Sequence, residues 1–296
     1  MNTVIECKNL THYYGKRLIY EDLNFSIEKG KVLGLLGKNG TGKTTTINIL
    51  NGYLEPRSGT CRLFGEDIRQ MKPQTRERIA LLIEGHQQFA FMNVVEIERF
   101  YSSFYPKWNK VVYYELISKL QIDPKQKIQS MSCGQRSQVA LGLILAQNAD
   151  LLILDDFSMG LDPGYRRLFI DYLKDYCSSE EKTVFVTSHI IQDLERFIDD
   201  CIILDYGNIL VQKPVKELMQ DFHKYRLSLS ESPDLSEKRY EFIYALEKHK
   251  SGWELYSYQS KDKVEQELRN LGLDYGDFSE EEMSLEDIFI GLTGKY

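Results

Sequence analysis

Short apolar segments dominate the first part of the chain. Residues 4–36 contain three that predict strands: VIECKNL, LNFSI and KVLGLLG. The third is almost entirely apolar, which is typical of a strand buried on both faces of a sheet. A glycine-rich turn at 37–42 follows it, and TTTINILNG then predicts a helix. This order indicates an α/β fold with a buried central strand.

Helical periodicity replaces the strand pattern from about residue 86 to 147, in segments such as EIERFYSSF and YYELISKLQI. We interpret this stretch as a helical insertion. The apolar segments LLILDD (151–156) and TVFVTS (183–188) predict a return to the sheet, with a helix over 164–177 between them. DCIILDYGNILVQ then predicts a hairpin with its turn at Tyr206–Asn208.

The composition changes after about Phe222. The polar stretch LSLSESPDLSEKRYEF is followed by the helical patterns DKVEQELRNL and SLEDIFIGLTGKY. With 296 residues, the chain has room for one large domain and one small one. We therefore predict a main domain over 1–221 and a small α+β accessory domain over 222–296.

Charge and composition exclude several classes of protein. The net charge is −7 and no Lys/Arg-rich stripe occurs, which argues against nucleic acid as a partner. The cysteines are scattered, which favours reduced, cytosolic thiols over a disulfide framework or zinc site. These are Cys7, Cys61, Cys133, Cys177 and Cys201. No signal peptide and no apolar stretch of about 18 residues is apparent, so we expect any membrane role to require a separate partner.

The segment at 37–44 carries the clearest chemistry. It satisfies the pattern G-x-x-x-x-G-K-[ST], between a buried strand and a helix. Glycines let the backbone N–H groups point at phosphate oxygens, Lys43 can reach the β- and γ-phosphates, and the Thr44 hydroxyl can bind Mg²⁺. The alternative is a structural glycine-rich turn with an exposed lysine. The expected ATP-binding residues here are Gly37, Lys38, Asn39, Gly40, Thr41, Gly42, Lys43, Thr44 and Thr45.

A second block, MSCGQRSQVALGLILAQNADLLILDDFSMGLDP over 131–163, is similar to the signature and D-loop region of ATP-binding cassette (ABC) proteins. The family's signature is usually LSGGQ; here it is MSCGQ. The order of the other parts agrees: Asp155 ends the LLILD strand, Asp162 fits the D-loop and His189 fits the switch histidine. The resemblance covers about residues 3–220. It implies a P-loop NTPase (RecA-like) ABC nucleotide-binding domain with a helical subdomain.

The resemblance also implies roles for individual residues. The signature residues Ser132, Cys133, Gly134 and Gln135 would bind the γ-phosphate of ATP held by an opposite subunit, at the N-terminus of a helix over 135–147. The protein would then act as a homodimer or heterodimer around ATP. Cys133 replaces a glycine, so the backbone dihedrals there are in question. We interpret the Cys133 thiol as buried and structural.

Aromatic and histidine residues are weaker candidates. Tyr14 in HYYGKRL fits the family's adenine-stacking aromatic, although an ordinary strand aromatic is the alternative. His189 would hydrogen-bond the γ-phosphate and orient water. The other histidines are interpreted as structural; these are His12, His86, His223 and His249.

Two positions depart from the family pattern. Asp155 would hold Mg²⁺, but the next residue is Asp156 where the family has the glutamate that acts as general base. The Q-loop glutamine position falls on Glu84, which can ligate Mg²⁺ but carries a charge; Gln87 and Gln88 are alternatives. Both departures bear on the rate of hydrolysis rather than on ATP binding.

Three further segments look like those of ATPase subunits of ABC-2-type bacterial exporters: FYPKWNK (104–110), SHIIQDLERFIDD and SLEDIFIGLTG. Such subunits pair with separate membrane proteins of about six helices. The resemblance therefore implies an ATPase of an ABC exporter, at the cytoplasmic face of the membrane beside its permease. Two alternatives are a regulatory or signalling ABC ATPase and a non-ABC small-molecule kinase. The MSCGQ block and His189 argue against the kinase.

Overall fold

The computed structural model describes residues 2–83, 85, 89–157, 161–188, 190–229, 240–249 and 252–294. The chain forms two compact units, Met1–Val211 and Gln212–Tyr296. This division lies earlier than the boundary expected after residue 221. The reason is helix α8 (Val215–Asp221), which packs against α10 (Leu285–Thr293) and so belongs to the second unit. The change in composition begins only after that helix.

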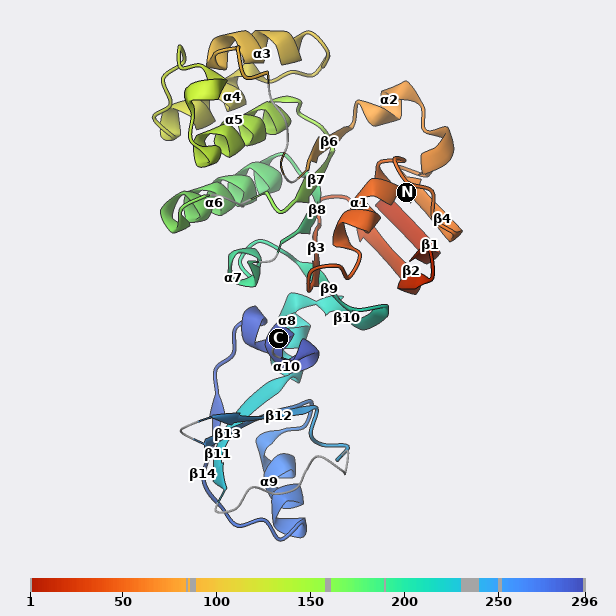
Figure 1. Cartoon of the computed structure of the whole chain (residues 1–296), viewed down its shortest axis with the longest axis vertical. Coiled ribbons are helices and arrows are strands. Elements are labelled where there is room, and N and C mark those ends of the chain that lie inside the picture. Colours follow the sequence, from red (N-terminus) through yellow and green to blue (C-terminus); the bar gives the residue numbers. More distant parts are fainter. Residues whose placement is uncertain are drawn as a thin grey trace. The chain divides into compact units, whose positions relative to one another are not determined.

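A six-stranded sheet forms the centre of the first unit, in the order β10-β9-β3-β8-β7-β6 (Figure 1). Strand β3 pairs in parallel with β8 and β9, and β7 pairs in parallel with β6 and β8. The strands are β3 (Val32–Gly37), β6 (Ile79–Leu82), β7 (Leu151–Asp155), β8 (Thr183–Thr187), β9 (Asp200–Asp205) and β10 (Asn208–Pro214). The predicted buried strand is confirmed, because every residue of β3 is buried.

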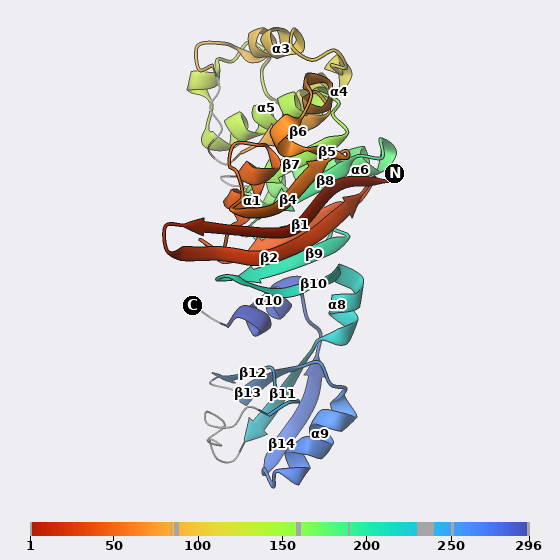
Figure 2. The ribbon, with the colours of Figure 1, turned by 90° about the vertical axis from the view of Figure 1, so that its right-hand side faces the viewer.

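A second, antiparallel sheet has the order β2-β1-β4-β5. Its two long strands lie side by side along their length (Figure 2). The strands are β1 (Thr3–Tyr14), β2 (Arg17–Glu28), β4 (Ser58–Leu63) and β5 (Glu66–Asp67). Helix α1 (Lys43–Leu50) contacts β4 of this sheet and β3 and β7 of the parallel one. A shared apolar core therefore fixes α1, and with it the loop before it.

Helices cover the remaining surfaces of the first unit. The predicted helical insertion is present as α3 (Val94–Ser102), α4 (Lys110–Lys119) and α5 (Cys133–Ala146), which pack on one another. Helix α6 (Pro163–Ser179) lies on the face of the parallel sheet opposite α1 (Figure 1). Two short helices, α2 (Pro73–Arg76) and α7 (Ile191–Leu194), complete the unit. Across the described ranges, no helix combines the length and apolar character that a membrane span requires.

The second unit is an α+β structure with an antiparallel sheet in the order β12-β13-β11-β14. One face packs on α9 (Lys261–Asn270), where Val264 and Leu268 join a core with Tyr225, Leu227 and Leu255. Charged side chains gather on the opposite face. The strands are β11 (His223–Leu229), β12 (Ala245–His249), β13 (Gly252–Ser257) and β14 (Tyr275–Glu281).

Candidate active site at the end of the central strand

The glycine-rich loop follows directly from β3, which ends at Gly37, and α1 begins at Lys43. Gly40 and Gly42 have φ angles of 81° and 110°, a backbone conformation that glycine adopts readily and other residues rarely do. A Cβ atom on Gly42 would also lie 2.6 Å from a methyl carbon of Ile19. Both observations explain why the loop needs glycine, and they place its N–H groups at the start of a helix.

The Lys43 side chain folds back over this loop. Its Nζ donates hydrogen bonds to the carbonyl oxygens of Gly37 at 2.7 Å and Lys38 at 3.1 Å, and the residue is only 7% exposed. The expectation of an exposed lysine is therefore wrong. Helix α1 begins at Lys43, one residue before Thr44, and the Lys43 ammonium lies inside the curve of the loop. A charge held there lies where phosphate oxygens would meet the backbone N–H groups.

Asp155 joins this loop to the parallel sheet. Its Oδ2 accepts a hydrogen bond from the Thr44 hydroxyl at 3.2 Å, and its Oδ1 accepts one from Thr187, its partner in the β7–β8 register. The residue is almost fully buried. Burial raises the pKa of Asp155 and the neighbouring Asp156 raises it further, while Thr187, Thr44 and Lys43 act in the opposite direction. A hydroxyl and a carboxylate in contact form an oxygen ligand set that fits Mg²⁺.

Asp156 follows β7 in an uncommon conformation. Its φ is 44°, in the left-handed region, and its backbone N–H donates to the Thr187 carbonyl at 3.1 Å. Aspartate and asparagine tolerate this region better than most other residues do. The backbone thus turns sharply after Asp155. This places Asp156 at the edge of the sheet where the phosphate loop also lies.

The signature segment lies at the start of a helix, as predicted, but this helix, α5, runs over Cys133–Ala146 rather than 135–147. Ser132 caps this helix: its hydroxyl accepts from the Gln135 N–H at 3.1 Å, and the Gln135 side chain accepts from the Ser132 N–H at 3.1 Å. Cys133 lies in helical conformation, so its position does not need glycine. Its thiol is exposed, and the interpretation of a buried thiol is wrong because the first turn of α5 lies at the surface.

Other expected residues differ in how they are placed. Tyr14 ends β1, is 50% exposed, and its ring meets the His12 ring edge-on at 4.9 Å. Thr45 is buried within α1, and Asp162 is the N-cap residue of α6. Several residues named from the sequence lie outside the described part of the chain: Glu84, His86, Gln87, Gln88 and His189.

The structure adds two residues that the sequence interpretation missed. Arg17, at the start of β2, donates from Nη2 to the Gly40 carbonyl at 3.0 Å, so a cation from the second sheet contacts the loop. Thr187 holds Asp155. The position of Thr187 in TVFVTSH, just before the expected switch histidine, was the available signal. Arg17 had none apart from its closeness to Tyr14.

Comparison with known proteins agrees with this geometry. The family model described as "ABC transporter" matches residues 20–158, a span that contains the phosphate loop, the signature segment and Asp155. Residues 20–158 thus form an ABC transporter domain. The curated relatives are ATP-binding subunits of ABC transporters, and the chain shares their enzymatic class, ATPase.

Curated ABC relatives extend over most or all of the chain. The bacitracin transport ATP-binding protein BcrA of Bacillus licheniformis is 29% identical over 318 residues, which cover 99% of this chain and 98% of that protein. The Nod factor export ATP-binding protein I of Cupriavidus metallidurans is 29% identical and covers 74% of each chain. A solved ATP-binding subunit of an ABC transporter has a TM-score of 0.64 at 23% identity, over 73% of this chain and 92% of that one, which supports the fold.

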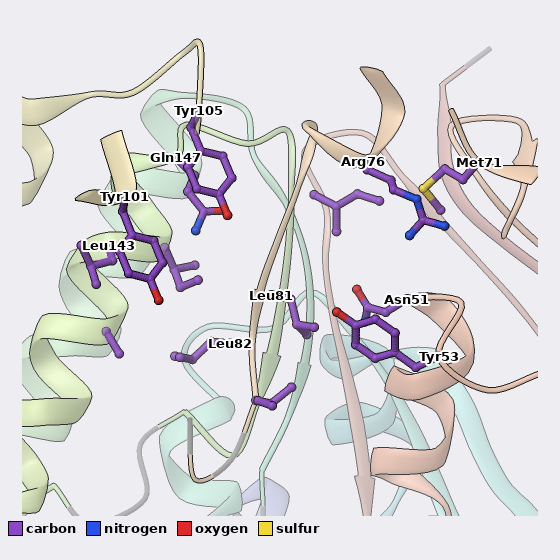
Figure 3. A pocket seen from close by; sticks show the side chains of 14 residues that line it. Asn51, Tyr53, Met71, Arg76, Leu81, Leu82, Tyr101, Tyr105, Leu143 and Gln147 are labelled. Atoms are coloured by element: carbon purple, nitrogen blue, oxygen red, sulfur yellow. The ribbon is translucent and has the colours of Figure 1, made fainter. Parts of the chain in front are cut away.

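This ABC domain also has a pocket of about 450 Å³ between the end of α1, strand β6 and the helical group (Figure 3). Tyr53, Tyr101 and Tyr105 border it together with Leu81 and Arg76. Tyr53 is 70% exposed. The pocket extends to Ile83, the last residue before Glu84, so it lies beside the segment that the sequence assigns to the Q-loop.

Proposed function

We propose that this chain is the Mg²⁺-dependent ATPase of an ABC exporter, working as a dimer around two ATP molecules. The observation that carries the proposal is the contact between Thr44 and Asp155 beside the phosphate loop. The export direction is supported by a relative whose name states Nod factor export.

The residues of the site would divide the work. The loop N–H groups and Lys43 bind the phosphates, and Tyr14 stacks on the adenine. Thr44 and Asp155 would hold Mg²⁺, which neutralises charge that develops on the transferred phosphate, with Glu84 as a further ligand. Asp156 orients the attacking water, assisted by His189. Asp162, in the expected D-loop, would be a further ATP-binding residue.

The family resemblance implies that each ATP site is composite: the phosphate loop of one subunit and the signature segment of the other form it together. The N-terminus of α5 carries Ser132, Cys133 and Gly134 at the surface, where backbone N–H groups and the helix dipole favour an anion. We assign the signature of one copy to the γ-phosphate held by the other because the family resemblance implies it.

The pocket at Tyr53 and Tyr101 is the proposed docking site of the permease. It is bordered by aromatic side chains and one arginine, a composition that suits an amphipathic helix from a partner. It also lies next to the strand that leads to Glu84, so an occupant there would lie beside β6, which precedes this candidate Mg²⁺ ligand. The subunit would then be held at the cytoplasmic face of the membrane through the permease.

A mixing experiment tests the dimer. Lys43→Ala disables the phosphate loop and Ser132→Arg places a bulky cation at the signature, so each homodimer should be inactive. An equal mixture should recover part of the wild-type ATPase rate, because one composite site in the mixed dimer is intact. Photo-crosslinking from Tyr53 in cells should capture a polytopic membrane protein, with Val111 as the exposed control position. No recovery on mixing, or capture from both positions alike, would contradict the proposal.

A further inference from the structure

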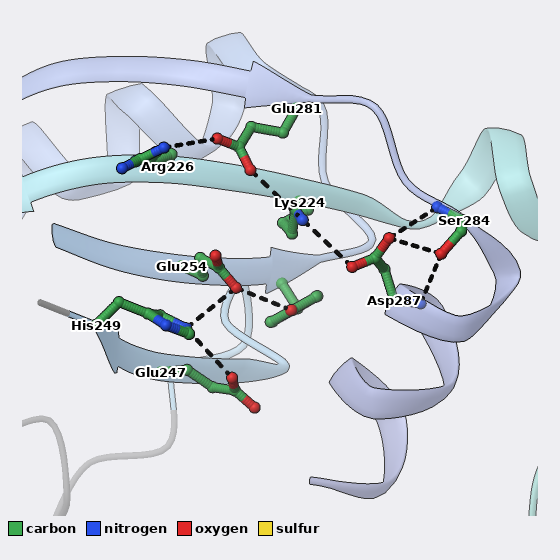
Figure 4. Close-up of polar contacts among 9 residues, drawn as sticks. Lys224, Arg226, Glu247, His249, Glu254, Glu281, Ser284 and Asp287 are labelled. Carbon is green, nitrogen blue, oxygen red and sulfur yellow. Dashed lines mark hydrogen bonds and ion pairs between the residues drawn. The ribbon is translucent and has the colours of Figure 1, made fainter. Parts of the chain in front are cut away.

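The polar face of the C-terminal sheet carries an unusual cluster. Glu247 and Glu254 are direct cross-strand partners in the β12–β13 pair, and His249 lies two residues beyond Glu247 on the same face. Their ligand atoms all lie within 4.8 Å of one another. Figure 4 shows the imidazole between the two carboxylates. Two carboxylates placed directly opposite each other destabilise a sheet unless a positive charge compensates them.

The distances suit a metal ion. The His249 Nε2 is 3.2 Å from Glu254 Oε2 and 3.5 Å from Glu247 Oε2. Bonds of about 2.0–2.2 Å to a tetrahedral zinc ion separate its ligand atoms by roughly 3.4 Å. Both distances therefore match those between the ligands of one ion. Only a small approach of the two carboxylates is needed, and the three side chains are 15–33% exposed, which leaves access for the ion.

Neighbouring charges favour a cation at this place. Among the residues of the network that the structure describes and Figure 4 labels, Glu247, Glu254, Glu281 and Asp287 are acidic while Lys224 and Arg226 are basic. Both cations contact Glu281, and Lys224 also contacts Asp287, although Arg226 is the register partner of Glu254 in the β11–β13 pair. The Tyr256 hydroxyl donates to Glu254 Oε2 at 3.3 Å and orients that carboxylate.

We propose that Glu247, His249 and Glu254 bind one divalent transition-metal ion, with zinc as the best fit. One imidazole and two carboxylates suit zinc better than Mg²⁺ or Ca²⁺, which prefer oxygen ligands alone. Three protein ligands leave a fourth position for water or for a group from another molecule. The ion would tie β12 to β13 and neutralise the cross-strand pair of glutamates.

Zinc titration of the full-length, chelator-treated protein tests this. The measurements use isothermal calorimetry without nucleotide, in a Cys133→Ser background that removes the exposed thiol. One zinc ion per chain should bind, and His249→Gln and Glu254→Gln should each weaken binding at least tenfold. Zinc should also raise the melting temperature of the parent protein and not that of these variants, because a ligand stabilises only the state that binds it.

Matched controls separate this site from others. His223→Gln removes a histidine that lies 2.8 Å from a single carboxylate, Glu280, and should leave zinc binding unchanged. Asp155→Asn removes the expected Mg²⁺ ligand in the other unit and should also have no effect. Cobalt bound at the site should show no thiolate charge-transfer band. Absence of saturable binding, or binding that survives both His249→Gln and Glu254→Gln, overturns the proposal and leaves the proposed ATPase function untouched.

Discussion

The Thr44 hydroxyl donates to the Asp155 carboxylate across 3.2 Å, which joins the first turn of α1 to the end of β7. The two residues are far apart in the sequence, yet the start of α1 and the end of β7 lie at the same edge of the parallel sheet. This contact brings together the two oxygen ligands expected for Mg²⁺. Replacing one of them should therefore change the metal dependence of ATP binding more than ATP binding itself.

Asp155→Asn should lose most of the gain in ATP affinity that Mg²⁺ provides, because a neutral amide is a weaker Mg²⁺ ligand than a carboxylate. Affinity for ATP in excess chelator should change little. Fluorescent-ATP titrations with and without Mg²⁺ measure both quantities. Thr44→Ser keeps the hydroxyl and is the control that should behave as the native protein does. Equal Mg²⁺ enhancement in Asp155→Asn would exclude Asp155 as a ligand.

Lys43→Ala should weaken ATP binding at least tenfold, about 1.4 kcal/mol. It should also lower the free energy of unfolding, since Lys43 donates to two loop carbonyls and charged hydrogen bonds contribute about 1.5–3 kcal/mol each. ATP titration and urea denaturation measure the two effects. Lys31→Ala, at an exposed lysine before β3, is the control. Unchanged ATP affinity in Lys43→Ala would contradict the phosphate-loop assignment.

The phosphate loop could be predicted from sequence because its chemistry is local. One short motif sets the turn, the glycines and the start of the helix. The direction of the Lys43 side chain could not be predicted, since it depends on how the loop carbonyls curve. The contact of Asp155 with Thr187 depends on the register of β7 with β8, and a chain position alone does not give that register.

The C-terminal unit illustrates the same limit. Its helices α9 and α10 follow from periodicity, and both match the predicted segments. His249 was interpreted as structural because a lone histidine in sequence shows no partner. Glu247 and Glu254 come close to His249 on one face only because β12 pairs with β13, and this pairing cannot be derived from a single histidine in the sequence.

His12 should make the stability of the first unit depend on pH. It is buried and, among the described residues, neither ring nitrogen has a hydrogen-bond partner. Burial lowers the pKa of His12 below 6.5, and Arg57 lowers it further. The unfolded chain therefore binds the proton more readily, so stability is full above about pH 6.5 and falls as the pH decreases below it.

Urea denaturation across roughly pH 5 to 8 measures this slope. His12→Phe removes the titrating group and keeps an aromatic ring beside Tyr14, so the slope should become smaller. Arg57→Gln should reduce it partially, because only the second cause is removed. A slope in His12→Phe as steep as in the native protein would assign the pH dependence to other groups.

Asp156 should make this protein a slow ATPase that stays in the ATP-bound dimer. Its carboxylate lies one methylene, about 1.5 Å, closer to the backbone than that of the family's glutamate. A general base must lie within hydrogen-bond reach of the water, and a misplacement of about 1 Å can cost on the order of a hundredfold in rate. Asp156 also has a left-handed φ of 44°, which aspartate adopts more readily than glutamate does, so a glutamate at this position would strain the backbone.

Asp156→Glu should therefore raise kcat with little change in ATP affinity, at a cost in stability of about 1 kcal/mol from backbone strain. Asp156→Asn keeps the preferred backbone, and should abolish the remaining hydrolysis and stabilise an ATP dimer, which size-exclusion chromatography with light scattering detects. Asp156→Gln has the length and strain of glutamate without its base, so it separates the two effects. Steady-state ATPase rates of all four proteins decide the matter: turnover in the native protein equal to or above that of Asp156→Glu means that Asp156 is already well placed.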